Sequence, residues 1–306
     1  MSSVAHQGEQ FVRANGIDIC YEIFGAADAE PMLLIMGLGA QMVLWDDSFC
    51  AQLAARGFRV IRFDNRDIGR SSKLSGGKRL TPLELLKLRF LRIPVTAPYK
   101  LHDMAKDTVG LMDALGIHSA HLVGASMGGM IAQEVAISFP HRLRSLTSIM
   151  STTGNPRVPP PSRQATAVLM APPPNTKDEF ITRFAQTYKI LRAGRFPQDE
   201  ALDRPRAERI FARGLSPAGS GRQLRAILAS GSRKERLASV KAPTLVIHGT
   251  ADPLVHPFGG KDTAASIPGA KLLMIEGMGH VLAVELWPQI IDAIAAHAHG
   301  AAAEAA

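Results

Sequence analysis

The sequence predicts an α/β fold: a mostly parallel central sheet of about eight strands, helices on both faces, and a helical cap inserted into it. Two observations predict this fold. Short apolar runs that end at glycine or aspartate alternate with segments of helical periodicity, and the alternation lapses only between residues 152 and 240. Short continuous apolar runs are typical of strands buried on both faces, as in parallel sheets.

The strands follow from one hairpin signal and six apolar runs. Residues 10–24 predict two strands that turn at Asn15 and Gly16, a pair typical of tight hairpins. The further strand candidates are residues 32–36, 58–63, 120–123, 143–150, 244–247 and 271–275. Helical periodicity predicts helices over residues 103–115, 127–139 and 286–297, the first followed by Gly116 and the second by Pro140.

The segment 152–240 has a different composition. Prolines cluster at 156–161 and again at 172–174, and helical stretches follow at 177–191 and 201–211. We therefore expect a core domain formed by residues 1–151 and 241–306, with residues 152–240 as a helical cap.

Composition narrows the class of protein. The chain has 306 residues, of which 46% are hydrophobic and 20% charged, which is typical of a globular protein and excludes global disorder. Two cysteines, Cys20 and Cys50, exclude a disulfide scaffold and a multi-cysteine metal site, and leave open one disulfide or two free thiols. The polar first residues and the lack of an apolar run of roughly 18 residues predict a cytoplasmic protein with no membrane span.

The net charge of +8 is concentrated in the cap segment. Residues 152–240 hold 16 Lys and Arg against 7 Asp and Glu. The charge fits either a nucleic-acid footprint or a solvated, arginine-rich helical surface. No aromatic-interleaved basic motif and no helix-turn-helix pattern accompanies it, so we expect the solvated surface and no nucleic-acid partner.

A candidate nucleophile lies at residues 124–128 (GASMG), which match the pattern G-x-S-x-G. The pattern alone is weak, and an incidental glycine-rich helix start is the alternative. The context is specific, however, because a predicted strand precedes Ser126 and a predicted helix follows it. Such a sharp turn leaves no room for side chains at Gly124 and Gly128, and it exposes the serine hydroxyl at a helix N-terminus.

A serine nucleophile needs a base and an orienting carboxylate. Asp252 follows the predicted strand 244–247, and His280 follows the strand 271–275. Both therefore lie with Ser126 at the carboxyl ends of parallel strands, where α/β sheets place their sites. We expect a catalytic triad of Ser126, Asp252 and His280.

Other titratable residues compete for these roles. The chain has ten histidines, and His256 is a weaker rival base. Asp262 and Glu276 are rival acids, but Asp262 falls in the next helix and Glu276 precedes a glycine turn. We expect His248 to pack or to cap a neighbouring element.

An oxyanion hole needs two donors. The backbone N–H of Met127 follows the nucleophile, and that of Leu38 lies in the glycine-rich loop after the strand 32–36. Leu38, Met127 and Trp45 are the candidate substrate contacts. The apolar cap residues that could join them are Val168, Leu169 and Phe184.

Together these motifs resemble the α/β-hydrolase superfamily, of the serine esterase type. The matching segments are residues 36–39 (MGLG), 64–71 (DNRDIGRS), 124–129 (GASMGG), 249–253 (GTADP) and 277–280 (GMGH). Within the superfamily they are most similar to the aclacinomycin methylesterase group, whose members remove methyl esters from polyketides. Many relatives carry His-Gly where this chain has Met36 and Gly37, so a hydrogen bond that braces this loop is expected to be missing.

The residues and the resemblance predict a serine hydrolase that cleaves a carboxylic ester, such as a methyl or other hydrophobic ester, through an acyl-enzyme. Hydrolysis of a lactone, thioester or C–C bond by the same triad is the alternative, followed by cofactor-free perhydrolysis and a non-catalytic ligand-binding role. We expect a small hydrophobic ester as substrate and no metal or organic cofactor. The sequence leaves a monomer and a homodimer open.

Overall fold

The computed structural model describes residues 4–76, 81, 84, 95–197 and 199–305. Its centre is an eight-stranded sheet in the order β1-β2-β4-β3-β5-β6-β7-β8, and from β4 to β8 the neighbouring strands are parallel. The strands are β1 (His6–Ala14), β2 (Ile17–Phe24), β3 (Glu30–Ile35), β4 (Phe58–Phe63), β5 (Ala120–Ala125), β6 (Leu143–Ile149), β7 (Thr244–Gly249) and β8 (Lys271–Ile275). The predicted sheet of about eight strands is confirmed.

The antiparallel edge of the sheet is built by the predicted hairpin. Ala14 of β1 pairs with Ile17 of β2, so Asn15 and Gly16 alone form the turn. Both have positive φ angles, 46° and 78°, as a type I′ turn requires. The β2 strand then pairs antiparallel with β4, which joins the hairpin to the parallel strands.

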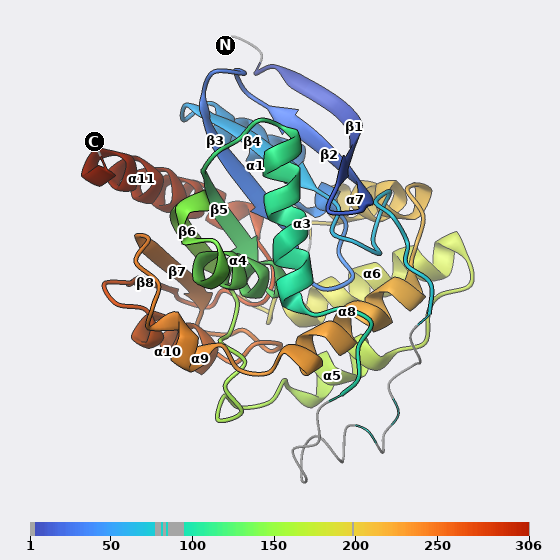
Figure 1. The fold of residues 1–306 in the computed structure, drawn as a ribbon. Helices are drawn as coiled ribbons and strands as arrows, with labels where there is room; N and C mark the ends of the chain where they lie inside the picture. Colours follow the sequence, from blue (N-terminus) through green and yellow to red (C-terminus); the bar gives the residue numbers. More distant parts are fainter. Residues whose placement is uncertain (1–3, 77–80, 82–83, 85–94, 198, 306) are drawn as a thin grey trace.

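Helices cover both faces of the sheet (Figure 1). On one face α1 (Asp47–Ala54) and α11 (Trp287–Ala305) share a hydrophobic core with the strands. On the other face lie α3 (Leu101–Ala114) and α4 (Met127–Ser138), and α10 (Phe258–Ser266) packs against β7 and β8. The sequence pattern does not reveal α1, because its eight residues give barely two turns.

The chain between β6 and β7 forms helices, as the sequence predicts. They are α5 (Arg163–Met170), α6 (Lys177–Leu191), α7 (Glu200–Ala212), α8 (Pro217–Ser230) and the short α9 (Lys234–Leu237). In Figure 1 the yellow-green to orange helices α5 to α8 lie together beside the sheet. We call residues 152–240 the cap segment, and its separation from a core domain stays a prediction.

The solvated surface that we expected holds for only part of the cap segment: Arg157, Arg163, Arg195 and Arg204 are exposed, whereas other arginines are buried. Several pair with acidic residues that follow β3 and β4, and the side chains of Arg213 and Arg222 are at most 7% exposed. The pairs are Arg206–Asp46, Arg209–Asp47, Arg213–Asp64 and Arg222–Asp67. Composition could not predict these ion pairs, because the carboxylates that neutralise the arginines lie far from them in the sequence. Much of the local positive charge is therefore neutralised where α7 and α8 meet the core.

The structure settles the alternative that the sequence left open for the two cysteines. Cys20 and Cys50 are both buried free thiols, and burial raises the pKa of each to about 12. No helix in the described part of the chain is long and apolar enough to cross a membrane.

Candidate active site

Ser126 occupies a strained turn between β5 and α4. Its φ of 56° is positive, which is unusual for a residue with a side chain. A Cβ at Gly124 would lie 2.2 Å from the Gly128 carbonyl oxygen, and a Cβ at Gly128 would lie 2.0 Å from that of Ile35. Only glycine fits at either position, as the sequence predicts for a nucleophile elbow.

The backbone around Ser126 is fixed by hydrogen bonds to the neighbouring strand. The Ser126 N–H donates to the Ile149 carbonyl oxygen at 2.9 Å, and the Ser151 hydroxyl donates to the Ser126 carbonyl oxygen at 2.7 Å. A Cβ at Gly129 would lie 2.6 Å from that of Ser151, so this glycine makes room for the brace. The role of Ser151 was not predicted, since it lies far from the motif in sequence.

Asp252 and His280 are brought together at the carboxyl ends of β7 and β8. The Nδ1 atom of His280 lies 2.7 Å from Oδ2 of Asp252, whose Oδ1 accepts the N–H groups of Leu254 and Val255 at 2.8 Å each. Burial would raise the pKa of the Asp252 carboxyl, but the charge of His280 and hydrogen bonds from both neighbouring histidines outweigh burial and hold that pKa below its ordinary value. The ionised carboxylate thus fixes the hydrogen of His280 on Nδ1 and leaves Nε2 as the basic atom.

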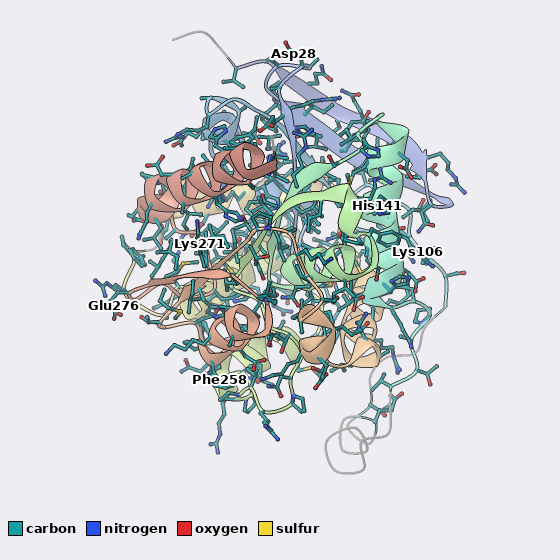
Figure 2. The ribbon with its side chains drawn as sticks, turned by 60° about the vertical axis from the view of Figure 1, so that its left-hand side comes forward. Asp28, Lys106, His141, Phe258, Lys271 and Glu276 are labelled. Atoms are coloured by element: carbon teal, nitrogen blue, oxygen red, sulfur yellow. The ribbon has the colours of Figure 1, made fainter. Side chains whose placement is uncertain are left out.

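The two rival acids have other partners. Glu276 projects away from the body of the molecule beyond β8, with a side chain 76% exposed, and accepts a hydrogen bond from Thr250 (Figure 2). Asp262 is buried on α10, where it accepts hydrogen bonds from Thr153 at 2.7 Å and Lys234 at 2.5 Å. Neither carboxylate is bonded to His280.

Two further histidines lie near the Asp252 turn. His256 lines the same cavity as Ser126 and His280, and its Nδ1 accepts the Phe258 N–H at 3.2 Å. His248 is buried at the end of β7, where its Nε2 lies 2.8 Å from the Val255 carbonyl oxygen and 3.4 Å from Oδ2 of Asp252. The sequence predicts a packing or capping role for His248 and gives no sign of its contact with Asp252.

The two predicted oxyanion donors flank the serine. A Cβ on Gly37 would lie 3.2 Å from that of Ser126, so the loop that carries Leu38 lies against Ser126. Met127 is the first residue of α4, and a helix has no internal acceptor for the N–H groups of its first turn. Within the described residues, no protein acceptor binds the N–H of Leu38 or of Met127.

The predicted oxyanion loop, residues 36–39, is braced by two other side chains in place of the hydrogen bond that we expected to be missing. The Asn65 side chain donates to the Met36 carbonyl oxygen at 2.9 Å, and Oε1 of Gln223 accepts the Gly39 N–H at 2.9 Å. Gln223 belongs to α8, so the cap segment itself supports the loop. No sequence pattern singles out Gln223, which comes close to the loop only in the folded chain.

Ser126 and His280 line a cavity of about 680 Å³. The candidate contacts Leu38, Trp45, Met127, Val168, Leu169 and Phe184 line it as well. Among the described residues, its titratable lining consists of Asp46 and Arg206, which pair with each other at 3.0 Å, of Tyr188, and of His256 and His280. The walls are otherwise mostly apolar and suit an uncharged, hydrophobic ligand.

Comparison with known proteins decides the family. Residues 30–285 match the family described as alpha/beta hydrolase fold. The protein belongs to this family. This α/β hydrolase is 30% identical to the rhodomycin D methylesterase of Streptomyces sp. strain C5 over 296 residues, which cover 90% of this chain and 92% of the relative. The corresponding enzyme of Streptomyces peucetius is 29% identical over the same shares, so the predicted resemblance to the methylesterase group is confirmed.

Solved structures agree on the fold of this α/β hydrolase. A hydrolase from Pseudomonas aeruginosa aligns with a TM-score of 0.69 and 26% identity, over 95% of this chain and 98% of that one. A meta-cleavage product hydrolase from Pseudomonas fluorescens aligns with a TM-score of 0.75 and 21% identity, over the same shares. The second likeness shows the shared fold alone.

Proposed function

We propose that this protein is a serine hydrolase that cleaves a carboxylic ester through an acyl-enzyme, with Ser126 as nucleophile, His280 as base and Asp252 as orienting acid. The observation that carries the proposal is the 2.7 Å contact between His280 and Asp252, beside a cavity that Ser126 also lines from its strained turn. The methylesterase relatives bear out the predicted class of enzyme, a carboxylic ester hydrolase.

In the first half-reaction, Nε2 of His280 takes the proton of the Ser126 hydroxyl while Oγ attacks the ester carbonyl carbon. The N–H groups of Leu38 and Met127 donate to the oxyanion of the tetrahedral intermediate. The C–O bond to the alcohol then breaks, and the alcohol leaves with the proton from His280. Asp252 stabilises the imidazolium formed in between.

In the second half-reaction, His280 takes a proton from water, and the resulting hydroxide attacks the acyl carbon on Ser126. The same N–H groups hold the oxyanion. Collapse of the intermediate returns the proton to Oγ of Ser126 and releases the carboxylic acid. These steps use the protein's own groups and need no metal or organic cofactor.

The proposed substrate is an uncharged, hydrophobic ester. The apolar cavity and the mutual neutralisation of Asp46 and Arg206 support such a substrate. Leu38, Trp45 and Met127 are the proposed contacts nearest the reacting carbonyl. The names of the two Streptomyces relatives support a methyl ester as the bond cleaved.

The same triad could also act on lactones, thioesters or C–C bonds, and the methylesterase relatives favour esters over these alternatives. A cytoplasmic location belongs to the proposal and is supported by two buried free thiols, which suit a reducing compartment. A monomer and a homodimer are both compatible with a site built entirely from one chain.

Hydrolysis of p-nitrophenyl acetate, butyrate and octanoate, and of an aromatic methyl ester followed by pH-stat, tests the proposal. Ser126→Ala should abolish turnover, whereas Ser239→Ala, at an exposed serine that bonds only its own turn, should retain it. The acyl chain length that is hydrolysed fastest indicates how long an acyl group the cavity accommodates. Turnover that persists in Ser126→Ala, or no turnover of any ester by the folded wild type, would overturn the proposal.

A further inference from the structure

We propose that His248 is a positioning residue for this site: it holds the turn of residues 252–255 and the Asp252 carboxylate in the orientation that receives His280. The inference rests on the proposed function of Asp252 and His280. His248 does not touch the cavity, so it acts through Asp252 and not on the substrate.

The geometry places one imidazole nitrogen between two acceptors of the same turn. His248 is 0% exposed on β7, and its Nε2 lies 2.8 Å from the Val255 carbonyl oxygen and 3.4 Å from Oδ2 of Asp252. The turn therefore contacts the Nε2 edge of the His248 ring. The Nε2–H group of His248 holds the Val255 carbonyl oxygen and also faces the Asp252 carboxylate.

The protonation of His248 follows from its partners. A carbonyl oxygen can only accept, so Nε2 must carry a hydrogen. Nδ1 is buried, and within the described residues it has no hydrogen-bond partner, so nothing stabilises a second proton there. We therefore assign a hydrogen to Nε2, which donates to the Val255 carbonyl oxygen and faces Asp252 at 3.4 Å, so His248 does not compete as the base.

The carboxylate of Asp252 then has donors on both oxygens. Oδ1 accepts the N–H groups of Leu254 and Val255, and Oδ2 faces both His280 and His248. This arrangement fixes the rotation of the carboxylate about its χ2 angle. Withdrawal of electron density by His248 also makes Oδ2 a weaker acceptor for His280 than it would otherwise be.

Other charged groups near the turn are engaged elsewhere. On α10, Asp262 binds Thr153 and Lys234, and after β8 Glu276 binds Thr250. His256, on the turn itself, accepts the N–H of Phe258. The titratable side chains that act on Asp252 are therefore His280 and His248.

Helix α10 holds the ring of His248 from another side. A Cβ at Gly260 would lie 2.6 Å from both Cβ and Nδ1 of His248, so glycine permits this close approach. The backbone of α10 thus packs directly on the imidazole and restricts its movement. Gly260→Ala would displace the ring without changing its chemistry.

The test uses His248→Phe, which removes the donor, and His248→Gln, which keeps an N–H donor. For His248→Phe we expect kcat on p-nitrophenyl butyrate to fall about tenfold with little change in KM, because a small misplacement of a catalytic group costs this much or more. The acidic limb of the pH profile of kcat/KM should move to higher pH, since Asp252 then stabilises imidazolium more strongly. His248→Gln should recover most of the rate, and Gly260→Ala should resemble His248→Phe.

The matched controls are His121→Gln and His121→Phe. His121 lies on β5, is buried like His248, and forms a hydrogen bond with the Ser145 hydroxyl. Both controls should keep the wild-type pH profile.

A second readout needs no substrate: the far-downfield proton resonance of the Asp252–His280 hydrogen bond should shift or broaden in His248→Phe. Folded His248 variants with the wild-type profile and resonance would overturn the inference. A wild type without esterase activity would overturn the proposed function, and the resonance would still decide the role of His248.

Discussion

The backbone N–H of His280 donates a 2.7 Å hydrogen bond to the carbonyl oxygen of Leu191, the last residue of α6. The proposed base is thereby tied to the cap segment. The same helix lines the cavity through Phe184 and Tyr188. The position of His280 therefore depends on a helix that also faces the ligand, so changes in the cap segment should affect kcat as well as binding.

Gly279 makes this contact possible, which gives a first prediction. A Cβ there would lie 2.1 Å from the Leu191 carbonyl oxygen. Gly279→Ala should push the His280 loop away from α6 and lower kcat about 100-fold, the cost of a misplacement near 1 Å. Steady-state kinetics on p-nitrophenyl esters measure the effect. Gly221→Ala on α8, where nothing lies within 4 Å, is the control and should leave kcat unchanged. Equal kcat values in the two variants would refute the coupling.

A second prediction separates Asp252 from its rivals. Asp252→Asn should lower kcat by about 10⁴, because an amide favours the wrong tautomer of His280. Asp262→Asn and Glu276→Gln should keep kcat within a few-fold, as neither side chain is bonded to His280. Kinetics on one ester with all three purified variants, checked for folding by circular dichroism, decide the point. A large loss in Asp262→Asn with an active Asp252→Asn would reverse the assignment.

A third prediction concerns the buried ion pairs beneath the cap segment. Arg222 binds Asp67 through two hydrogen bonds of 2.7 and 2.9 Å, and Tyr99 donates to the same carboxylate. Arg222→Met should reduce the free energy of unfolding by about 3–5 kcal/mol, because Asp67 is then left buried without its cation. Arg204→Met, in the exposed pair with Glu208, should change it by at most about 0.5 kcal/mol. Urea denaturation measures both values, and equal losses would contradict this account.

A fourth prediction links His121 to pH. Burial lowers the pKa of His121 from 6.5 to about 4, whereas the unfolded chain keeps the ordinary value. Between these pH values the unfolded state binds more protons, so stability present at pH 7 is lost as the pH falls through this window, by about 3 kcal/mol at most. His121→Gln lacks this contribution.

Urea denaturation at pH 7 and pH 4 measures the difference. The wild type should lose more free energy of unfolding on acidification than His121→Gln does. His118→Asn, at an exposed histidine, should follow the wild type. If the wild type and His121→Gln lose the same free energy of unfolding on acidification, His121 titrates normally in the folded protein and the prediction is wrong.

The sequence predicted those parts of the fold that local chemistry decides. The hairpin turn at Asn15 and Gly16, the bounds of α6 and the glycines around Ser126 each follow from steric or periodic rules acting over a few residues. Helix α1 escaped prediction because it is short, and the helix predicted over 286–297 continues to Ala305, with Ala298 and Ala301 buried beyond its predicted end.

By itself the sequence determined which residues could form a nucleophile, a base and an acid, because strand order puts the ends of β5, β7 and β8 at one edge of the sheet. It did not determine what supports them. The contacts of His248 with Asp252, of Gln223 with the oxyanion loop and of Leu191 with His280 join segments that are distant in sequence or meet only through side-chain orientation. No local pattern encodes such contacts, since they depend on how the cap helices pack against the sheet. That packing also buries some arginines of the basic cap segment, such as Arg213 and Arg222, in ion pairs where we had expected a solvated surface.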